Sequence, residues 1–153
     1  MQAAFEDEGV CGDRENSVML MLGLTAKISK CIQLGTRLKC IDNSGAKELE
    51  LMAVKGYKGK HRRLPKAGVG DIIVCTVKKG DEKVRHTVVY AVIVRQKSPF
   101  RRPDGTRVTF TDNAAVLVNQ KTYEPVGSEI RTAIAKEVVE RFSAIGKIAS
   151  VVV

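Results

Sequence analysis

The chain is 153 residues long, 44% of them hydrophobic, and 26 Lys and Arg against 17 Asp and Glu give it a formal charge of +9. This composition supports one folded domain, or one domain with a tail, and excludes general disorder. The chain has only two histidines, which excludes metal catalysis by several histidines. Aromatic residues make up 5% of the chain, which argues against binding single-stranded nucleic acid mainly by base stacking. Apolar runs such as residues 18–24 are far too short to cross a bilayer, so no membrane is expected among the partners.

Residues 1–24 are predicted to form an acidic N-terminal tail, followed by a single domain over residues 25–153. The first 17 residues hold five carboxylates and one arginine, a net charge of −4. A secretory or mitochondrial leader would be basic here, so the cytoplasm is the expected compartment. The four cysteines lack zinc-knuckle spacing, and we expect buried free thiols at Cys40 and Cys75 and no metal or cofactor.

Strand-like patterns begin at about Thr36, where polar and apolar residues alternate or apolar residues run together. A turn is predicted at residues 42–45, and a second turn at residues 78–83. Asp104-Gly105 is a hairpin signal between residues 100–102 and 107–110. The other predicted strands are 36–41, 47–54, 72–77, 87–94 and 115–118.

One segment near the C-terminus has a helical pattern. Ile130, Ile134, Val138 and Phe142 recur at a spacing of four, with charged residues between them. Five or six short strands followed by one or two short helices predict a mainly β protein built on a small β-barrel, because closure removes exposed sheet edges.

Positive charge is concentrated in residues 55–102, which carry fourteen Lys or Arg and three acidic residues, a net charge of +11. Like charges held together on a folded surface repel one another, so this density favours a nucleic-acid partner over a merely solvated surface. Two long segments, each after a predicted strand, contain much of this positive charge. Residues 55–70 include seven Lys, Arg or His and four glycines, and residues 95–107 form a basic segment bracketed by prolines.

The residues that could support catalysis do not form a recognisable constellation. His61 lies in the basic loop and His86 next to Arg85, and neither has a carboxylate and nucleophile nearby in the sequence. The glycines of residues 56–70 lack both the Gly-Lys-Ser/Thr ending and the Gly-x-Gly-x-x-Gly spacing of phosphate-binding loops. The chain is therefore not expected to be an enzyme.

Eight short motifs follow one another with no large gap over about residues 34–153. They are Cys40-Ile-Asp-Asn-Ser-Gly-Ala46, Arg63-Leu-Pro-Lys-Ala-Gly-Val-Gly-Asp71, Val77-Lys-Lys-Gly80, Ala91-Val-Ile-Val-Arg-Gln-Lys97, Arg101-Arg-Pro-Asp-Gly105, Phe110-Thr-Asp-Asn-Ala-Ala-Val-Leu117, Gly127-Ser-Glu-Ile130 and Ala135-Lys-Glu-Val138. In this order they resemble the universal L-fourteen family of large-subunit ribosomal proteins. The form with Arg-Arg-Pro-Asp-Gly and a valine-rich C-terminus is similar to the archaeal and eukaryotic cytosolic branch.

The resemblance implies a five-stranded barrel with a projecting β-ribbon and short C-terminal helices, acting as a structural protein at the subunit interface. Its implied partners are large-subunit rRNA, small-subunit rRNA at an intersubunit bridge, neighbouring ribosomal proteins and subunit anti-association factors. Carried over by position, the rRNA-binding residues are Lys55, Lys58, Lys60, His61, Arg62, Arg63, Lys66, Lys78, Lys79, Arg95, Lys97, Arg101, Arg102 and Arg107. The residues nearest the bridge are Arg131, Lys136 and Arg141.

The N-terminal segment of the chain departs from the family, because members of this branch usually have a shorter and less acidic N-terminal segment. We therefore hypothesise that translation in the cell starts at Met19 or Met21, which peptides beginning at Met1 or Gln2 would contradict. Two rival functions remain. A small barrel that holds an acidic protein would keep its partner after ribonuclease treatment, and a free RNA-binding factor of the OB type would need more aromatic residues on one sheet face.

Overall fold

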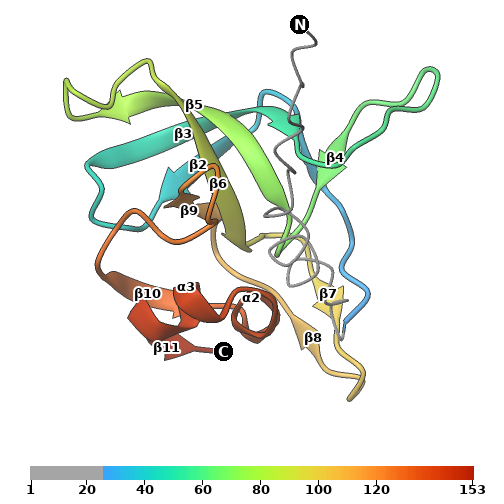
Figure 1. The fold of residues 1–153 in the computed structure, drawn as a ribbon. Helices are drawn as coiled ribbons and strands as arrows, with labels where there is room; N and C mark the ends of the chain where they lie inside the picture. The colour runs from blue at the N-terminus through green and yellow to red at the C-terminus, as the bar shows by residue number, and fades with distance from the viewer. Residues whose placement is uncertain (1–25) are drawn as a thin grey trace, which may run out of the picture.

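The computed structural model describes residues 26–153, so the predicted acidic tail and the hypothesis about Met19 or Met21 lie outside the described residues (Figure 1). The predicted mainly β fold and its five-stranded barrel are confirmed. The barrel closes in the order β2-β3-β5-β6-β9, with β2 and β9 parallel and the other neighbours antiparallel. Its strands are β2 (Arg37–Cys40), β3 (Ala46–Val54), β5 (Ile72–Gly80), β6 (Val88–Arg95) and β9 (Ala114–Val118).

The strand patterns follow from which faces are covered. In β3, Leu49 and Leu51 are buried, while Glu48 and Glu50 alternate with them on the outer face. Successive side chains of a strand point to opposite faces, and all five residues of β9 are buried. Both faces of β9 are therefore covered, one by the barrel interior and one by other parts of the chain.

Three small two-stranded sheets surround the barrel. The hairpin predicted at Asp104-Gly105 is confirmed as the β7–β8 ribbon, and Gly105 has the positive φ of 84° that its turn requires. The sheets are β1 (Ile32–Gln33) with β4 (Lys66–Ala67), β7 (Phe100–Arg101) with β8 (Arg107–Val108), and β10 (Ile130–Ile134) with β11 (Ala149–Val152), the last pair parallel.

The C-terminal unit consists of β10, β11 and two short helices, α2 (Lys136–Arg141) and α3 (Ser143–Ile148). The prediction of one helix running from Ile130 to Phe142 is wrong in its first part, because Ile130–Ile134 is a strand. A spacing of four places side chains on one face both in a helix and in a strand, so the apolar pattern could not distinguish them. All four residues of the pattern are buried, as the pattern indicated.

The turn predicted at residues 78–83 is shifted. Strand β5 continues to Gly80, so Lys78 and Lys79 lie in the strand opposite carboxylates of β3. The chain turns over residues 81–87 instead, where the N–H of Val84 and that of Arg85 donate to the carbonyl of Asp81. Paired Lys and Glu side chains across the strands explain why a polar run extends the strand rather than ending it.

The cysteines of the described residues are free thiols in different environments. Cys75 is buried, as predicted, and burial raises its pKa to about 12. Cys40 is only half-buried, and burial together with the nearby Asp42 carboxylate raises its pKa far above the usual range. Cys31 is exposed and directly precedes β1.

Candidate nucleic-acid interface

The first basic element is the loop that joins β3 to β4 and extends away from the barrel (Figure 1). All seven predicted cations of this loop are exposed, and residues 55–66 contain no Asp or Glu. The tip is a tight turn in which the N–H of Arg63 donates to the carbonyl of Lys60 at 3.0 Å, and Arg62 has a positive φ of 60°. Positive φ is uncommon for a side chain of this size, so the turn holds Arg62 in a strained conformation.

Lys55 lies at the stem of the loop, close to one aromatic ring on β6 and to another in the turn after β9. Its ammonium nitrogen is 4.3 Å from the ring centroid of Tyr123 and 6.0 Å from that of Tyr90. A cation over a ring face is attracted by the π electrons. Lys55 therefore has an intramolecular contact that the cations of the loop tip lack among the described residues.

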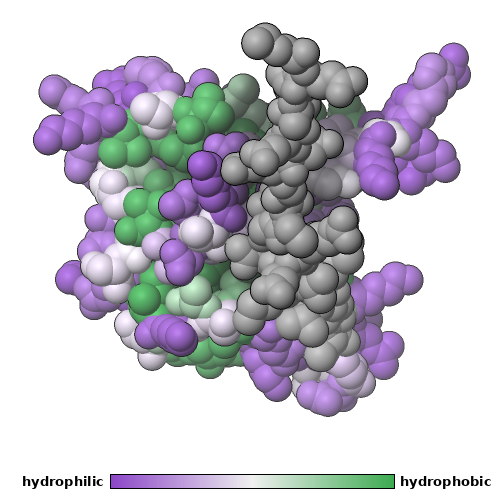
Figure 2. All heavy atoms as spheres, viewed as in Figure 1, coloured by the Kyte–Doolittle hydropathy of each residue, from purple (hydrophilic) through white to green (hydrophobic). Residues whose placement is uncertain are grey.

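The second basic element is the β7–β8 ribbon, which extends on the same side of the view as the loop (Figure 1). Figure 2 shows hydrophilic side chains gathered at the ends of both projections. Arg101 and Arg107 are exposed and directly opposite each other in the strand register, and Lys97 is exposed just before the ribbon. Like charges directly opposite destabilise a strand pair, and an anion between them removes that repulsion.

Arg95 and Arg102, both predicted to contact rRNA, are engaged within the protein. The Arg95 side chain is only 11% exposed, lies 3.1 Å from Asp112, and donates to the carbonyl of Ala133. Arg102 donates to both carboxylate oxygens of Glu137, at 2.6 and 3.2 Å, and this hydrogen bonding raises the pKa of Arg102. These two arginines connect the ribbon and its flanking strand to the C-terminal unit.

Lys78 and Lys79 also have carboxylate partners, on the outer face of the barrel. Lys78 lies 3.5 Å from Glu50, and Lys79 donates to Glu48 at 2.8 Å. The hydrogen bond from Lys79 lowers the pKa of Glu48. The predicted cations thus fall into a set on the loop and ribbon that has no carboxylate partner among the described residues and a set that is paired with carboxylates.

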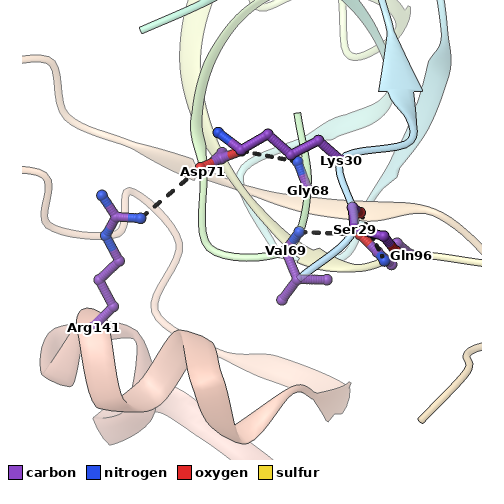
Figure 3. Close-up of polar contacts among 7 residues, drawn as sticks. All are labelled: Ser29, Lys30, Gly68, Val69, Asp71, Gln96 and Arg141. Atoms are coloured by element: carbon purple, nitrogen blue, oxygen red, sulfur yellow. Dashed lines mark hydrogen bonds and ion pairs between the residues drawn. The ribbon is translucent and has the colours of Figure 1, made fainter. Parts of the chain in front are cut away.

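A fully buried glutamine, Gln96, connects the bases of the two basic elements (Figure 3). Its oxygen accepts from the N–H of Val69 at 3.2 Å, after the loop, and its nitrogen donates to the carbonyl of Ser98 at 3.0 Å, before the ribbon. The same nitrogen donates to the carbonyl of Ser29 at 3.3 Å. Gln96 was not predicted as a site residue, since a lone glutamine after a strand carries no signal of its own.

Asp71 forms a second connection beside it (Figure 3). Its carboxylate accepts from the N–H of Gly68 at 3.0 Å and lies 3.3 Å from the ammonium of Lys30 and 3.9 Å from the guanidinium of Arg141. Asp71 therefore links the loop base to the N-terminal segment and to the end of α2. Lys30 and Tyr57, which line a groove beside the tip of the basic loop, were also missed as site residues.

The three residues predicted near an intersubunit bridge lie in the C-terminal unit but have different environments. Arg131 on β10 is exposed and 3.1 Å from Glu129, and Lys136 at the start of α2 is exposed and 3.7 Å from Glu140. Arg141 is half-buried and directed at Asp71 on the barrel. Only Arg131 and Lys136 therefore present much of their side chains to solvent.

Within residues 26–153, no group of three or more His, Cys, Asp or Glu side chains could hold a metal ion. The helices of the same range are too short to span a membrane.

Comparison with known proteins identifies the family. The family model described as "Ribosomal protein L14p/L23e" matches residues 31–153. Large ribosomal subunit protein uL14 of Thermoplasma volcanium is 50% identical over 133 residues, which cover 87% of this chain and all of the relative. The corresponding proteins of Thermoplasma acidophilum and Methanocella arvoryzae are 49% and 45% identical over the same share of both chains. These archaeal relatives agree with the predicted branch, and the chain belongs to the ribosomal protein L14p/L23e family, as a structural, non-enzymatic constituent of the large ribosomal subunit.

Proposed function

We propose that this protein binds large-subunit rRNA, in cytoplasmic ribosomes, through the tip of the 55–66 loop and through the β7–β8 ribbon. The observation that carries the proposal is the set of exposed cations without a carboxylate partner among the described residues, above all the opposed pair Arg101 and Arg107. Phosphates between such cations would remove their mutual repulsion. The set is Lys58, Lys60, His61, Arg62, Arg63, Lys66, Lys97, Arg101 and Arg107.

The proposed mechanism is structural. Two projections, fixed to one buried glutamine, neutralise phosphates at two places and hold the RNA between them in one geometry. Phosphate contacts position a protein without reading bases, so RNA shape should matter more than sequence. The internally paired Arg95, Arg102, Lys78 and Lys79 contribute little to phosphate binding in this scheme.

The C-terminal unit is the part that we propose for the small-subunit rRNA bridge. Arg131 and Lys136 are exposed there, and each has only a solvent-accessible carboxylate near it. The Arg131–Glu129 pair, with side chains 84% and 49% exposed, contributes little stability, so Arg131 can exchange its carboxylate for a phosphate at little cost. Neighbouring ribosomal proteins and anti-association factors are the further proposed partners of the exposed face.

The test compares two double variants of equal charge loss. Arg62→Ala with Arg63→Ala removes cations that have no carboxylate partner among the described residues, while Lys78→Ala with Lys79→Ala removes cations paired with Glu50 and Glu48. Each lost phosphate contact should reduce the slope of log K against log salt by about 0.7–0.9. We expect the loop variant to lose roughly 1.5 from the slope and to be depleted from large subunits in magnesium-depleted, salt-washed sucrose gradients.

The control should keep both the slope and its place in the large subunit, and circular dichroism should show a folded barrel in both variants. Equal losses in the two variants would mean that net charge alone determines binding. Normal incorporation of the loop variant into large subunits would refute the proposed role of the loop tip in rRNA binding.

A further inference from the structure

An open groove lies beside the basic loop. It has a volume of about 500 Å³ and is lined by Lys30, Tyr57, Arg63, Leu64 and Lys66. Sites for small organic groups have volumes of about 300–1,000 Å³, so the groove is large enough for such a group. Its lining combines apolar and cationic side chains, which indicates the chemistry of an occupant.

The apolar part consists of Tyr57 and Leu64. Their exposed fractions are 38% and 63%, although the rest of the loop is dominated by charged residues and glycine. The Tyr57 hydroxyl donates to the carbonyl of Arg63 at 3.2 Å, so the ring is tied to the far side of the loop. A held aromatic ring beside an exposed leucine is a ready surface for a flat apolar group, whose contact would remove both side chains from water.

The charged part consists of three cations. Arg63 and Lys66 are exposed and form no ion pair with a carboxylate of residues 26–153. Lys30 shares the Asp71 carboxylate but keeps 59% of its side chain exposed. The groove is therefore net positive, and its occupant should carry negative charge next to its flat part.

A nucleotide has both properties, a planar base and a phosphate. In a duplex the bases are stacked and paired, whereas an unpaired base can be splayed out and stacked on an aromatic side chain. The low aromatic content argues against stacking as the main mode of binding, but one stacking position beside a basic loop is compatible with it. We propose that this groove holds a single unpaired nucleotide of the rRNA, with its base on Tyr57 and Leu64 and its phosphate near Arg63 and Lys66.

The inference rests on the proposed rRNA binding and adds a local preference to it. The test titrates the full chain with two RNA hairpins of equal charge, one fully paired and one with a single bulged nucleotide carrying 2-aminopurine. Base–aromatic stacking corresponds to roughly a 5- to 100-fold difference in affinity. We expect the bulged hairpin to bind more tightly by that factor, with a change in 2-aminopurine fluorescence.

Two variants of Tyr57 separate the ring from its hydroxyl. Tyr57→Phe keeps the ring and should keep the preference for the bulged hairpin, while Tyr57→Leu should bind both hairpins equally, without the fluorescence change. Both should keep the wild-type salt dependence, because no cation is removed. Arg62→Ala, outside the groove lining, should weaken binding to both hairpins alike.

The outcomes distinguish the two proposals. Salt-dependent binding of both hairpins with equal affinity would overturn the nucleotide inference and leave the proposed function standing. Absence of salt-dependent binding to either hairpin would overturn the proposed function and the inference with it. Displacement of the bulged hairpin by oligoglutamate from wild type, but not from Tyr57→Leu, would assign the groove to an acidic peptide and overturn the inference.

Discussion

Replacing Arg102 with methionine should destabilise the protein through the carboxylate that it leaves behind. Glu137 lies at the start of α2 with a side chain that is only 3% exposed, and Arg102, 18% exposed, donates to both of its oxygens. The same guanidinium donates to the carbonyl of Val153 at 2.8 Å. Without it, a buried carboxylate has lost its cation, and the ribbon has lost its connection to the C-terminal unit.

Removing one partner of a buried ion pair costs about 3–5 kcal/mol, and exposed pairs contribute at most about 1 kcal/mol. Because Arg102 keeps some contact with water, we expect a loss near the lower limit, about 3 kcal/mol. For a chain of this size that loss lowers Tm by roughly 10 °C. Arg131→Met is the matched control, since Arg131 lies 3.1 Å from Glu129 but the side chains are 84% and 49% exposed.

The assay is urea unfolding of the full chain for four proteins: wild type, Arg102→Met, Glu137→Met and the double variant. The double variant should be more stable than the sum of the two single losses predicts, because it leaves no unpaired buried charge. A loss of unfolding free energy in Arg102→Met no greater than that in Arg131→Met would refute the role of the buried carboxylate. Simple addition of the two single losses in the double variant would refute it as well.

Two further predictions concern the barrel. Asp42→Ala should cost about 1–3 kcal/mol and speed hydrogen exchange at Leu117, because the Asp42 carboxylate accepts from that buried N–H at 2.9 Å; unchanged exchange would contradict this. The ordinary thiol pKa of 9.0 is raised in folded Cys75 to about 12, so the unfolded state ionises first and stability should fall as pH rises through this window. The free energy of unfolding should fall less steeply with pH in Cys75→Ala than in wild type. Equal slopes in the two proteins would show that the Cys75 thiol does not cause the fall.

Local patterns predicted the strands because the barrel has distinct inner and outer faces. The alternation of Leu49 and Leu51 with Glu48 and Glu50 in β3 is the clearest case. Barrel closure, in contrast, depends on the parallel pairing of Lys39 with Ala114, and no local pattern encodes a contact over that separation. The sequence indicated closure only through the general cost of open edges and the family resemblance.

The candidate site was predictable in its charge but not in its pairing. The exposed loop cations follow from a segment with many lysines and arginines and no carboxylate. Arg95 and Arg102 belong to the same basic region, yet their partners Asp112 and Glu137 are 17 and 35 residues away. Folding brings these carboxylates to them, so only the structure distinguishes an arginine available to RNA from one that holds the fold together.

The parallel contact between β2 and β9 also affects how the protein can be made. Because β2 lies between β3 and β9, a growing chain has one edge of β2 and one edge of β6 unpaired until residue 118 has been synthesised. Open edges pair readily with other chains, and contacts between distant segments form slowly. The nascent protein therefore remains an open sheet until β9 has been synthesised, and this is the stage at which a chaperone or early RNA contact would protect it most.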